Sequence, residues 1–123
     1  MEQETKNIEP QYIKIYVYPH GVFNVLDKSE ILVYIQLMQM VDKNNIIKLD
    51  QDAKKEIMSS LGFSSLGTVS SALTSLKKVK VIASVDRGVY MFNPTYSALS
   101  TISSRAINKL IKKFNTLVND TLL

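Results

Sequence analysis

The chain has 123 residues, 46% of them hydrophobic and 21% charged, and it contains no cysteine. This length and composition are typical of one globular domain, and they exclude a disordered chain, a disulfide framework and a thiolate metal site. No apolar run approaches the roughly 20 residues that cross a bilayer, and the polar, mildly acidic first residues are unlike a signal peptide. We therefore expect a cytoplasmic protein with a flexible N-terminal tail over residues 1–11.

The charge of the chain is distributed unevenly. Residues 1–61 carry seven Lys or Arg against nine Asp or Glu, a net charge of −2, whereas residues 62–123 carry eight against two, a net charge of +6. A basic half on a small domain indicates a polyanionic partner, nucleic acid rather than a membrane. Plain solvation of exposed lysines explains the same asymmetry without a partner, so charge alone leaves both interpretations open.

The first half of the chain predicts a strand and a helix. Tyr12–Tyr18 alternates and is rich in β-branched and aromatic residues, which indicates a strand that Pro19–Gly21 ends. Val22–Leu26 is expected to form a short second strand or an extended lead-in. Asp27, with Glu30 three residues later, has the spacing of a capping box. A helix is therefore expected from about Lys28 to Val41, and its apolar stripe contains Ile31, Tyr34, Ile35, Met38 and Val41.

Two further helices are predicted on either side of a tight turn. Ile46–Leu49 is a short strand candidate, and Asp50 then caps a helix of about ten residues that Gly62 ends. After the turn at 61–64, a helix from Ser65 to Lys78 buries Leu66, Val69, Leu73 and Leu76. Its opposite face consists of small or polar residues, namely Gly67, Thr68, Ser71, Thr74, Ser75 and Lys78.

The last third predicts a hairpin and a long helix. Two β-rich runs flank a turn at Asp86–Gly88, and Asn93–Tyr96 closes the unit because Pro94 cannot continue a ladder. Ser100–Leu122 is expected to be an amphipathic helix that dimerises or docks on the core. Its heptad-like seam contains Ile107, Leu110, Phe114, Leu117 and Thr121, and its basic residues are Arg105, Lys109, Lys112 and Lys113.

This order of elements predicts a mainly α fold with a small β-sheet, a winged helix-turn-helix followed by a C-terminal amphipathic helix. Two helices joined by a short turn containing Gly form a helix-turn-helix, and a hairpin directly after the second helix makes the wing. The winged-helix domain is expected over 12–96 and the C-terminal helix over 97–123. A homodimer is expected to use Ile107, Leu110, Phe114 and Leu117.

The helix over 65–78 is the expected DNA-binding element, because its outer hydroxyls can bond to phosphates and base edges. No carboxylate occurs between Glu56 and Asp86 to repel the phosphates. The expected partner is double-stranded DNA. Major-groove contacts are assigned to Ser64, Ser65, Thr68, Ser71 and Thr74, and phosphate contacts to Lys78, Lys80 and Arg87, together with Lys54 and Lys55 on the preceding helix.

Enzymatic interpretations find little support in the sequence. Gly62 and Gly67 have phosphate-loop spacing, but Thr68 follows directly where Lys-Ser/Thr is needed. His20 is the only histidine, and no His, Cys or Asp cluster has metal-ligand spacing. We therefore expect no enzyme activity, no catalytic or metal-ligating residues and no cofactor.

The stretch from Leu26 to Tyr96 resembles the RepL-type plasmid replication proteins of Gram-positive bacteria. The resemblance is carried by Gly88, Val89 and Tyr90 at the end of the wing and by the Asn93–Pro94 dipeptide. It implies a winged helix, sequence-specific binding at a plasmid origin and recruitment of host replication proteins. Through this resemblance Ser65, Thr68 and Ser71 match the helix positions that face DNA, and Arg87 lies at the wing.

Other functions use the same DNA surface or none. A winged-helix transcriptional regulator and a centromere-binding plasmid partition protein would be chemically identical at the duplex. A protein-interaction module that kept the fold but lost DNA binding is a third possibility. A steep dependence of affinity on salt separates the DNA binders from this last class.

Overall fold

The computed structural model describes residues 12–16 and 21–122, with side chains up to residue 119. The expected N-terminal tail, the last two residues of the predicted first strand and residues 19–20 of the turn that follows it lie outside the described residues, as does the side chain of Thr121 in the predicted seam. The described part is a mixed α/β fold with five helices and five short strands. In chain order these are β1 Ile13–Ile15, α2 Val22–Val25, α3 Lys28–Met38, β2 Ile46–Lys48, α4 Gln51–Leu61, α5 Leu66–Lys78, β3 Ile82–Asp86, β4 Val89–Phe92, β5 Ser97–Leu99 and α6 Ser104–Leu122.

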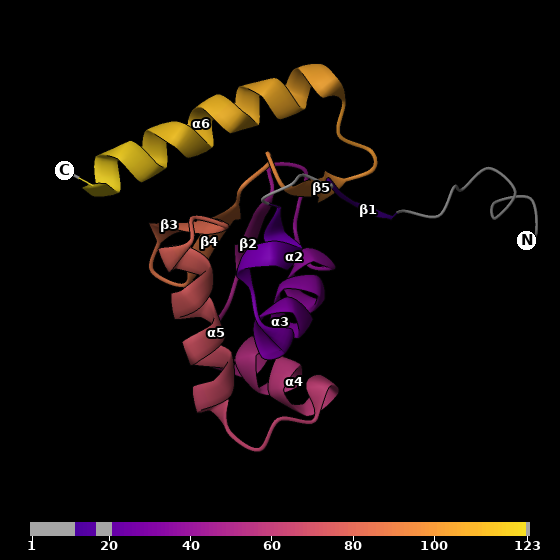
Figure 1. The fold of residues 1–123 in the computed structure, drawn as a ribbon, viewed down its shortest axis with the longest axis vertical. Coiled ribbons are helices and arrows are strands. Elements are labelled where there is room, and N and C mark those ends of the chain that lie inside the picture. The colour runs from indigo at the N-terminus through magenta and orange to yellow at the C-terminus, as the bar shows by residue number, and fades with distance from the viewer. Residues whose placement is uncertain (1–11, 17–20, 123) are drawn as a thin grey trace, which may run out of the picture.

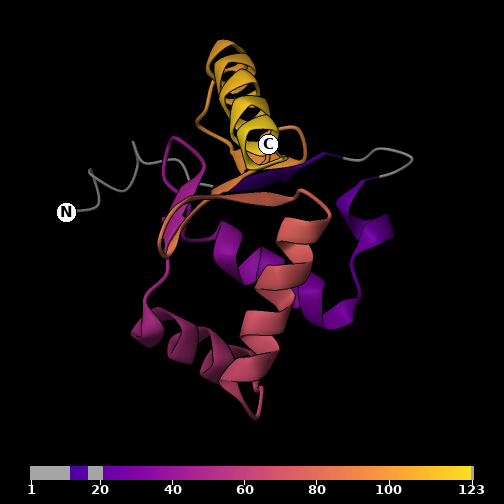
Figure 2. The same cartoon turned by 90° about the vertical axis from the view of Figure 1, so that its left-hand side faces the viewer.

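The elements are arranged with the strands between two helical regions. Helices α3, α4 and α5 gather on one side of the strands, and α6 crosses the other side (Figures 1 and 2). The connection between α4 and α5 is at the end of the molecule farthest from α6. The two helical regions therefore lie at opposite ends of the folded molecule, over the residues that the structure describes.

The segment 22–26 is helical, which corrects the predicted strand or extended lead-in. The N–H of Asn24 donates to the carbonyl oxygen of Gly21 at 3.0 Å, which closes a single helical turn. Val22 and Leu26 are buried, whereas Phe23 and Val25 are exposed. A separation of four residues between buried side chains fits one helical turn and not the two-residue period of a strand.

Helix α3 begins where the sequence predicts and ends earlier. The capping box is present, since the Asp27 side chain accepts from the Glu30 N–H at 2.9 Å and the Glu30 side chain from the Asp27 N–H at 3.0 Å. The helix ends at Met38 rather than near Val41. Its buried residues are Val33, Tyr34, Leu37 and Met38, and Ile35 is exposed, which corrects the predicted stripe. Almost every position from 31 to 38 is apolar, so periodicity could not decide which side faces the core.

Two antiparallel sheets replace the single small sheet that the sequence predicts. The larger has the strand order β2–β4–β3, with Ile47 opposite Tyr90 and Ile82 opposite Phe92. The smaller pairs β1 with β5, and Ile15 lies opposite Ser97. The sequence does not predict strand β5, which lies in the region 97–123 assigned to the C-terminal helix, and α6 starts at Ser104 instead of Ser100. The pairing joins segments more than 80 residues apart, so no local pattern indicates it.

The hydrophobic interior has two parts. The larger cluster packs α3, α4 and α5 against β2 and the start of β3. The smaller one lies beneath α6, where Leu110 and Phe114 pack with Ala83, Met91 and Ala98. Phe114 is 1% exposed and Leu110 is 8% exposed. These two side chains have almost no surface left for another molecule, so their assignment to a dimer interface is corrected and the docking alternative holds for them.

The other two residues assigned to the dimer interface, Ile107 and Leu117, are half-buried beside the same cluster. Their apolar surface is therefore largely used within the chain, like that of Leu110 and Phe114. The seam predicted from heptad spacing is the face by which α6 docks on the strands. A heptad pattern of two repeats describes an apolar helix face equally well when its partner is a sheet of the same chain.

A buried polar network connects the two clusters. The Tyr34 hydroxyl on α3 donates to the Ser97 hydroxyl on β5, which in turn donates to the Met38 sulfur at 3.3 Å. Asn45 is fully buried with a φ of 62°, and its side-chain amide donates to the carbonyl oxygens of Phe92 at 3.1 Å and Ser97 at 2.9 Å. Burial raises the pKa of Tyr34 to about 12. This network holds α3, β4 and β5 in one arrangement.

Candidate nucleic-acid interface

The candidate interface begins at the connection between α4 and α5. The Asp50 side chain accepts from the Ala53 N–H at 2.8 Å and caps α4, as the sequence predicts. Gly62 ends α4 with a φ of 72°, a left-handed conformation that glycine adopts without steric cost. The Phe63 N–H then donates to the Met58 carbonyl oxygen at 2.9 Å. This C-terminal cap turns the chain within a few residues, so α5 packs directly against α4.

Helix α5 is held by one strongly buried face. Val69, Ala72, Leu73 and Leu76 are each at most 4% exposed. Leu66, which was expected to belong to this face, is only half-buried. Burial of three large aliphatic side chains contributes several kcal/mol, about 1.5–3 kcal/mol for each. The outer face of α5 is therefore presented on a fixed support.

The solvent side of α5 is a surface of small and basic residues that we call the outer strip. Its members are all exposed: Gly67, Ser70, Ser71, Thr74, Lys77 and Lys78. Thr68 and Ser75, which the sequence places on this face, are half-buried at its edge. Ser70 and Lys77 are not among the residues that the sequence places on this face. The outer strip is thus turned toward Ser70 and Lys77 relative to the prediction, because the packing of α5 against α3 covers the side that contains Thr68.

The hydroxyl-bearing residues of the outer strip, Ser70, Ser71 and Thr74, are all exposed. The Thr74 hydroxyl donates to the Ser70 carbonyl oxygen at 3.1 Å. Ser64 and Ser65, which precede α5, are also exposed. Ser65 is the N-cap residue, yet its side chain makes no capping hydrogen bond. The hydroxyl of Ser65 is therefore available to a partner at the N-terminal end of α5.

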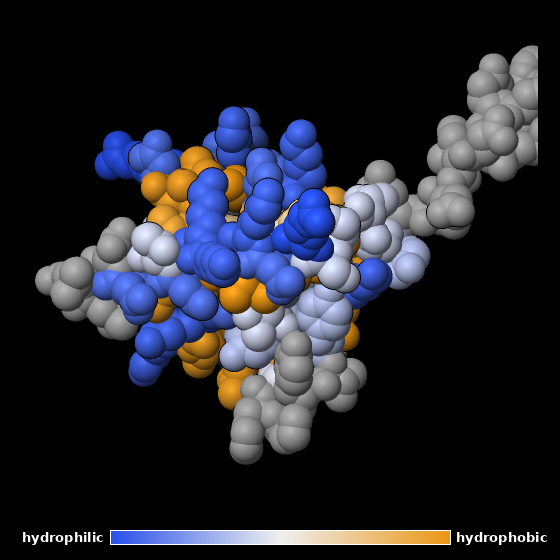
Figure 3. Space-filling view, turned by 90° about the horizontal axis from the view of Figure 1, so that it is seen from above, coloured by the Kyte–Doolittle hydropathy of each residue, from blue (hydrophilic) through white to orange (hydrophobic). Residues whose placement is uncertain are grey.

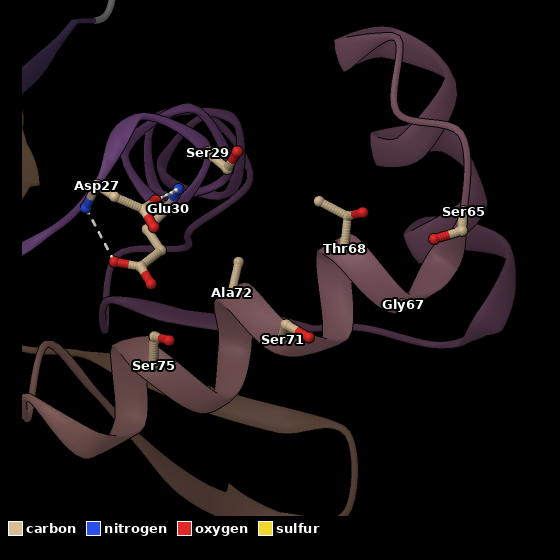
Figure 4. A pocket seen from close by; sticks show the side chains of 9 residues that line it. All are labelled: Asp27, Ser29, Glu30, Ser65, Gly67, Thr68, Ser71, Ala72 and Ser75. Atoms are coloured by element: carbon tan, nitrogen blue, oxygen red, sulfur yellow. Dashed lines mark hydrogen bonds between the residues drawn. The ribbon is translucent and has the colours of Figure 1, made fainter.

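A shallow concavity of about 370 Å³ separates α5 from the start of α3. Figure 4 shows Thr68 and Ala72 directed from α5 toward this space, with Asp27, Ser29 and Glu30 across it on α3. Helix α5 itself carries no carboxylate, but the carboxylates of Asp27 and Glu30 border it from the start of α3. The sequence indicates Asp27 and Glu30 only as a capping box. Their position beside α5 depends on how α3 and α5 pack.

Three lysines gather at the C-terminal end of α5, and we call them the lysine cluster: Lys77, Lys78 and Lys80. They line a second concavity, of about 300 Å³, together with Ile82, Ala83 and Val118. The Lys77 ammonium nitrogen lies 5.9 Å from the centre of the Tyr90 ring, a cation–π distance. The predicted phosphate contacts Lys78 and Lys80 are therefore adjacent in space, and Lys77 joins them.

The hairpin places Arg87 at its exposed tip. The Arg87 N–H donates to the Asp86 side chain at 2.8 Å, and Gly88 has a φ of 68°. The Leu49 N–H donates to the Gly88 carbonyl oxygen at 2.7 Å, which holds the tip beside the start of α4. A Cβ at Gly88 would lie 3.0 Å from the Leu49 carbonyl oxygen, so only glycine fits closely here. On α4, Lys55 is exposed and Lys54 is half-buried.

Other kinds of site were also sought in the described residues. Within 12–16 and 21–122, no group of three or more His, Cys, Asp or Glu is placed to hold a metal ion. Over the same part of the chain, no helix has the length and apolar character that a membrane crossing requires.

The chain was compared with protein-family models, curated protein sequences and solved structures, and none of these matches it. The resemblance to RepL-type replication proteins therefore stays a prediction from the sequence.

Proposed function

We propose that this chain binds double-stranded DNA through a winged helix-turn-helix. In this proposal α4 and α5 are the two helices of the motif, α5 enters the major groove, and the β3–β4 hairpin is the wing. The observation that carries the proposal is the outer strip of α5, which is exposed to solvent and consists of glycine, small hydroxyl-bearing residues and lysines, with no carboxylate.

The dimensions of α5 suit a major groove. Its 13 residues extend for about 20 Å, and a helix with side chains about 10–12 Å across fits a groove about 12 Å wide. Gly67, Ser70 and Ser71 add little bulk to the helix, so the backbone of α5 can approach base edges closely. Hydroxyls donate and accept, and they therefore contact either phosphates or bases.

Basic side chains flank the outer strip, and in this proposal they contact the phosphate backbone of the bound duplex. The lysine cluster is at the C-terminal end of α5, and Arg87 is at the tip of the wing. Lys55 on α4 is exposed on the helix that crosses the backbone in this motif. Contacts of this kind fix the position of the protein on DNA, while the hydroxyls of α5 read the sequence.

The carboxylates beside α5 restrict how the duplex lies. Asp27 and Glu30 each use one oxygen in the capping box, which leaves the other oxygen of each group available. A phosphate is repelled from this side of α5, so the duplex is centred on Ser70, Thr74 and Lys77, which are exposed and do not line the concavity.

The proposal is tested by placing a carboxylate on the outer strip. Ser71→Glu and Thr74→Glu, made separately, are expected to weaken duplex binding by about tenfold or more, because each introduces a negative charge against the DNA. Both positions are exposed, so the thermal unfolding midpoint is expected to stay within about 2 °C of the wild type. Affinity is measured by fluorescence anisotropy with a labelled duplex drawn from the chain's own gene neighbourhood.

A matched control is Thr101→Glu, which replaces an exposed hydroxyl by the same carboxylate in the connection between β5 and α6. This variant is expected to bind as the wild type does. If Ser71→Glu binds as tightly as Thr101→Glu, the outer strip does not lie in the groove and the proposal is wrong.

The role at a plasmid origin is a narrower proposal that derives from the sequence resemblance. Footprinting distinguishes it from the alternatives, since repeated sites at an origin favour replication or partition and a single operator at a promoter favours regulation. Salt dependence tests the protein-interaction alternative. A protein with four to eight phosphate contacts loses affinity with a slope of about −0.9 per contact in log[salt].

A further inference from the structure

The outer face of α6 is a second basic surface. It is remote from the N-terminal half of α5 (Figure 1), whereas the lysine cluster at the C-terminal end of α5 shares a concavity with Val118 of α6. Four exposed side chains, which we call the basic stripe, follow one side of the helix: Arg105, Lys109, Lys112 and Lys113. Their separations of four, three and one residues place them within about one third of the helix circumference. No Asp or Glu occurs from Ser104 to Asn119. Figure 3, which looks down onto α6, shows hydrophilic side chains standing along this face.

The opposite face of α6 is already occupied. Phe114 is 1% exposed and Leu110 8% exposed, because both pack on the strands of the same chain. A basic amphipathic helix that binds a membrane must bury its apolar face among lipids. That face of α6 is unavailable unless the helix leaves the core, so only the cationic side can meet a partner.

The charge of the stripe selects the kind of partner. A second copy of this chain in a symmetric contact would place one set of four cations against another, which is repulsive. A polyanion is complementary. From Arg105 to Lys113 the stripe extends for about 12 Å, a length of duplex that carries roughly seven phosphate charges. Long lysine and arginine side chains reach phosphates without entering a groove.

The position of α6 separates this surface from the first one. The α4–α5 connection and α6 are at opposite ends of the molecule in both views (Figures 1 and 2). A duplex about 20 Å across that is seated on the first half of α5 therefore does not also cover the outer side of α6.

We propose that the basic stripe of α6 binds the phosphate backbone of a second DNA duplex, so that one molecule bridges two duplexes. The proposal depends on the proposed function of α5 for the first duplex. The contact at α6 is independent of sequence, because it involves phosphates and no base edges.

A capture assay tests this. One duplex is fixed to beads, the full-length protein is bound to it, and a fluorescent second duplex is added; the signal is the amount of second duplex captured per protein molecule bound. Lys109→Gln with Lys112→Gln removes two charges and keeps a good helix former at both positions. We expect capture by this variant to fall about tenfold while its binding to the bead duplex changes less than about threefold.

The control is Lys28→Glu, which lowers the net charge by the same two units at an exposed position at the start of α3. Its capture per bound molecule is expected to equal that of the wild type. Equal capture by the α6 variant and the control overturns the proposal, and so does a wild type that captures no second duplex. If a dimer bridged two duplexes through its two α5 helices, changes in α6 would not reduce capture. The α6 variant would then capture as much as the control, which also overturns the proposal.

Two further arms separate the remaining outcomes. Stronger binding of the wild type to anionic vesicles than to the second duplex, lost in the α6 variant, would assign the stripe to a membrane and overturn the proposal. Ser71→Glu reports on the first site: if it binds the bead duplex normally while the α6 variant does not, the function proposed for α5 fails and the stripe still binds DNA. Failure of one proposal is thus distinguishable from failure of the other.

Discussion

Helices α5 and α6 are both amphipathic and both dock through their apolar faces, but their solvent faces differ in kind. The outer strip of α5 is mainly Gly, Ser and Thr, with lysines confined to its C-terminal end, and carboxylates from α3 border it. The outer face of α6 carries long cationic side chains along its length. Small side chains permit close approach of a backbone, whereas long cations reach phosphates from a distance. One surface is suited to reading a groove, and the other to sequence-independent contact.

The largest effect we expect concerns how α6 is held. Phe114→Ala is expected to lower the free energy of unfolding by about 3–5 kcal/mol, because it removes a fully buried aromatic side chain from the smaller cluster. Urea denaturation measures this change. Phe23→Ala, at a position that is 49% exposed on α2, is the matched control and is expected to cost less than about 1 kcal/mol.

A cost for Phe114→Ala as small as that of the control would show that α6 does not dock on the strands in solution. The comparison between α5 and α6 would then fail, because the apolar face of α6 would be free for a partner. Sedimentation of both variants distinguishes this case, since a dimer held by that face changes its mass.

The second prediction concerns Tyr34, which belongs to the buried polar network between the two hydrophobic clusters. The pKa of Tyr34 is raised from 10 to about 12 by burial in the folded state. Above pH 10 the unfolded chain releases this proton and the folded chain keeps it, so the free energy of unfolding falls as pH rises. Between pH 10 and pH 12 this one group contributes a loss of about 1.4 kcal/mol per pH unit. Below pH 10 its contribution is constant.

Urea unfolding at pH 9 and pH 11 checks the prediction for Tyr34. Tyr34→Phe should lose less stability between these two pH values than the wild type does, because the titrating hydroxyl is gone. Tyr12→Phe, at a position that is 61% exposed, should keep the wild-type dependence. Identical losses in all three proteins would place the Tyr34 hydroxyl in contact with water rather than with Ser97.

The smallest expected effect concerns the carboxylates beside α5. Asp27→Asn with Glu30→Gln keeps oxygen acceptors for both capping-box bonds and removes two negative charges from the edge of the concavity. We expect duplex affinity to rise about threefold at low salt, and the gain to diminish at high salt, because exposed charges are screened. Fluorescence anisotropy at two salt concentrations measures both.

Asp42→Asn is the matched control for this pair. Its carboxylate also accepts backbone N–H groups, from Asn44 and Ile46, but it follows the opposite end of α3. It is expected to leave duplex affinity unchanged. If Asp27→Asn with Glu30→Gln lowers affinity instead, these carboxylates do not repel the duplex and the orientation proposed for it is wrong.

Much of the candidate site follows from local signals in the sequence. The capping box at Asp27, the stop at Gly62 and the turn at Arg87–Gly88 are each encoded by residues within a few positions, and each is present in the structure. Helix α5 buries three large apolar residues at helical spacing, Val69, Leu73 and Leu76. The sequence predicts all three on its inner face. These features arise from backbone geometry and hydrogen bonds that need no distant partner.

Other parts of the site could not be read from the sequence. Thr68 is half-buried and Lys77 is exposed, although the sequence places Thr68 on the outer face and not Lys77, because α5 packs on α3 along one flank and presents the other to solvent. The carboxylates of Asp27 and Glu30 border α5 although they are some 40 residues away in the chain. A helical wheel shows which side of a helix is apolar, but not which neighbours its flanks meet.

The sequence by itself determined the order of the four longer helices, the limits of α4 and α5, the hairpin, and the absence of acidic residues on α5. Only the tertiary structure decided that β1 pairs with β5, that the heptad-like face of α6 docks on the strands of its own chain, and that acidic groups border one flank of α5 while basic groups gather at its C-terminal end. The physical reason is the range of the interactions. Caps, turns and periodicity act within a few residues, whereas burial depends on which apolar faces meet across the whole chain.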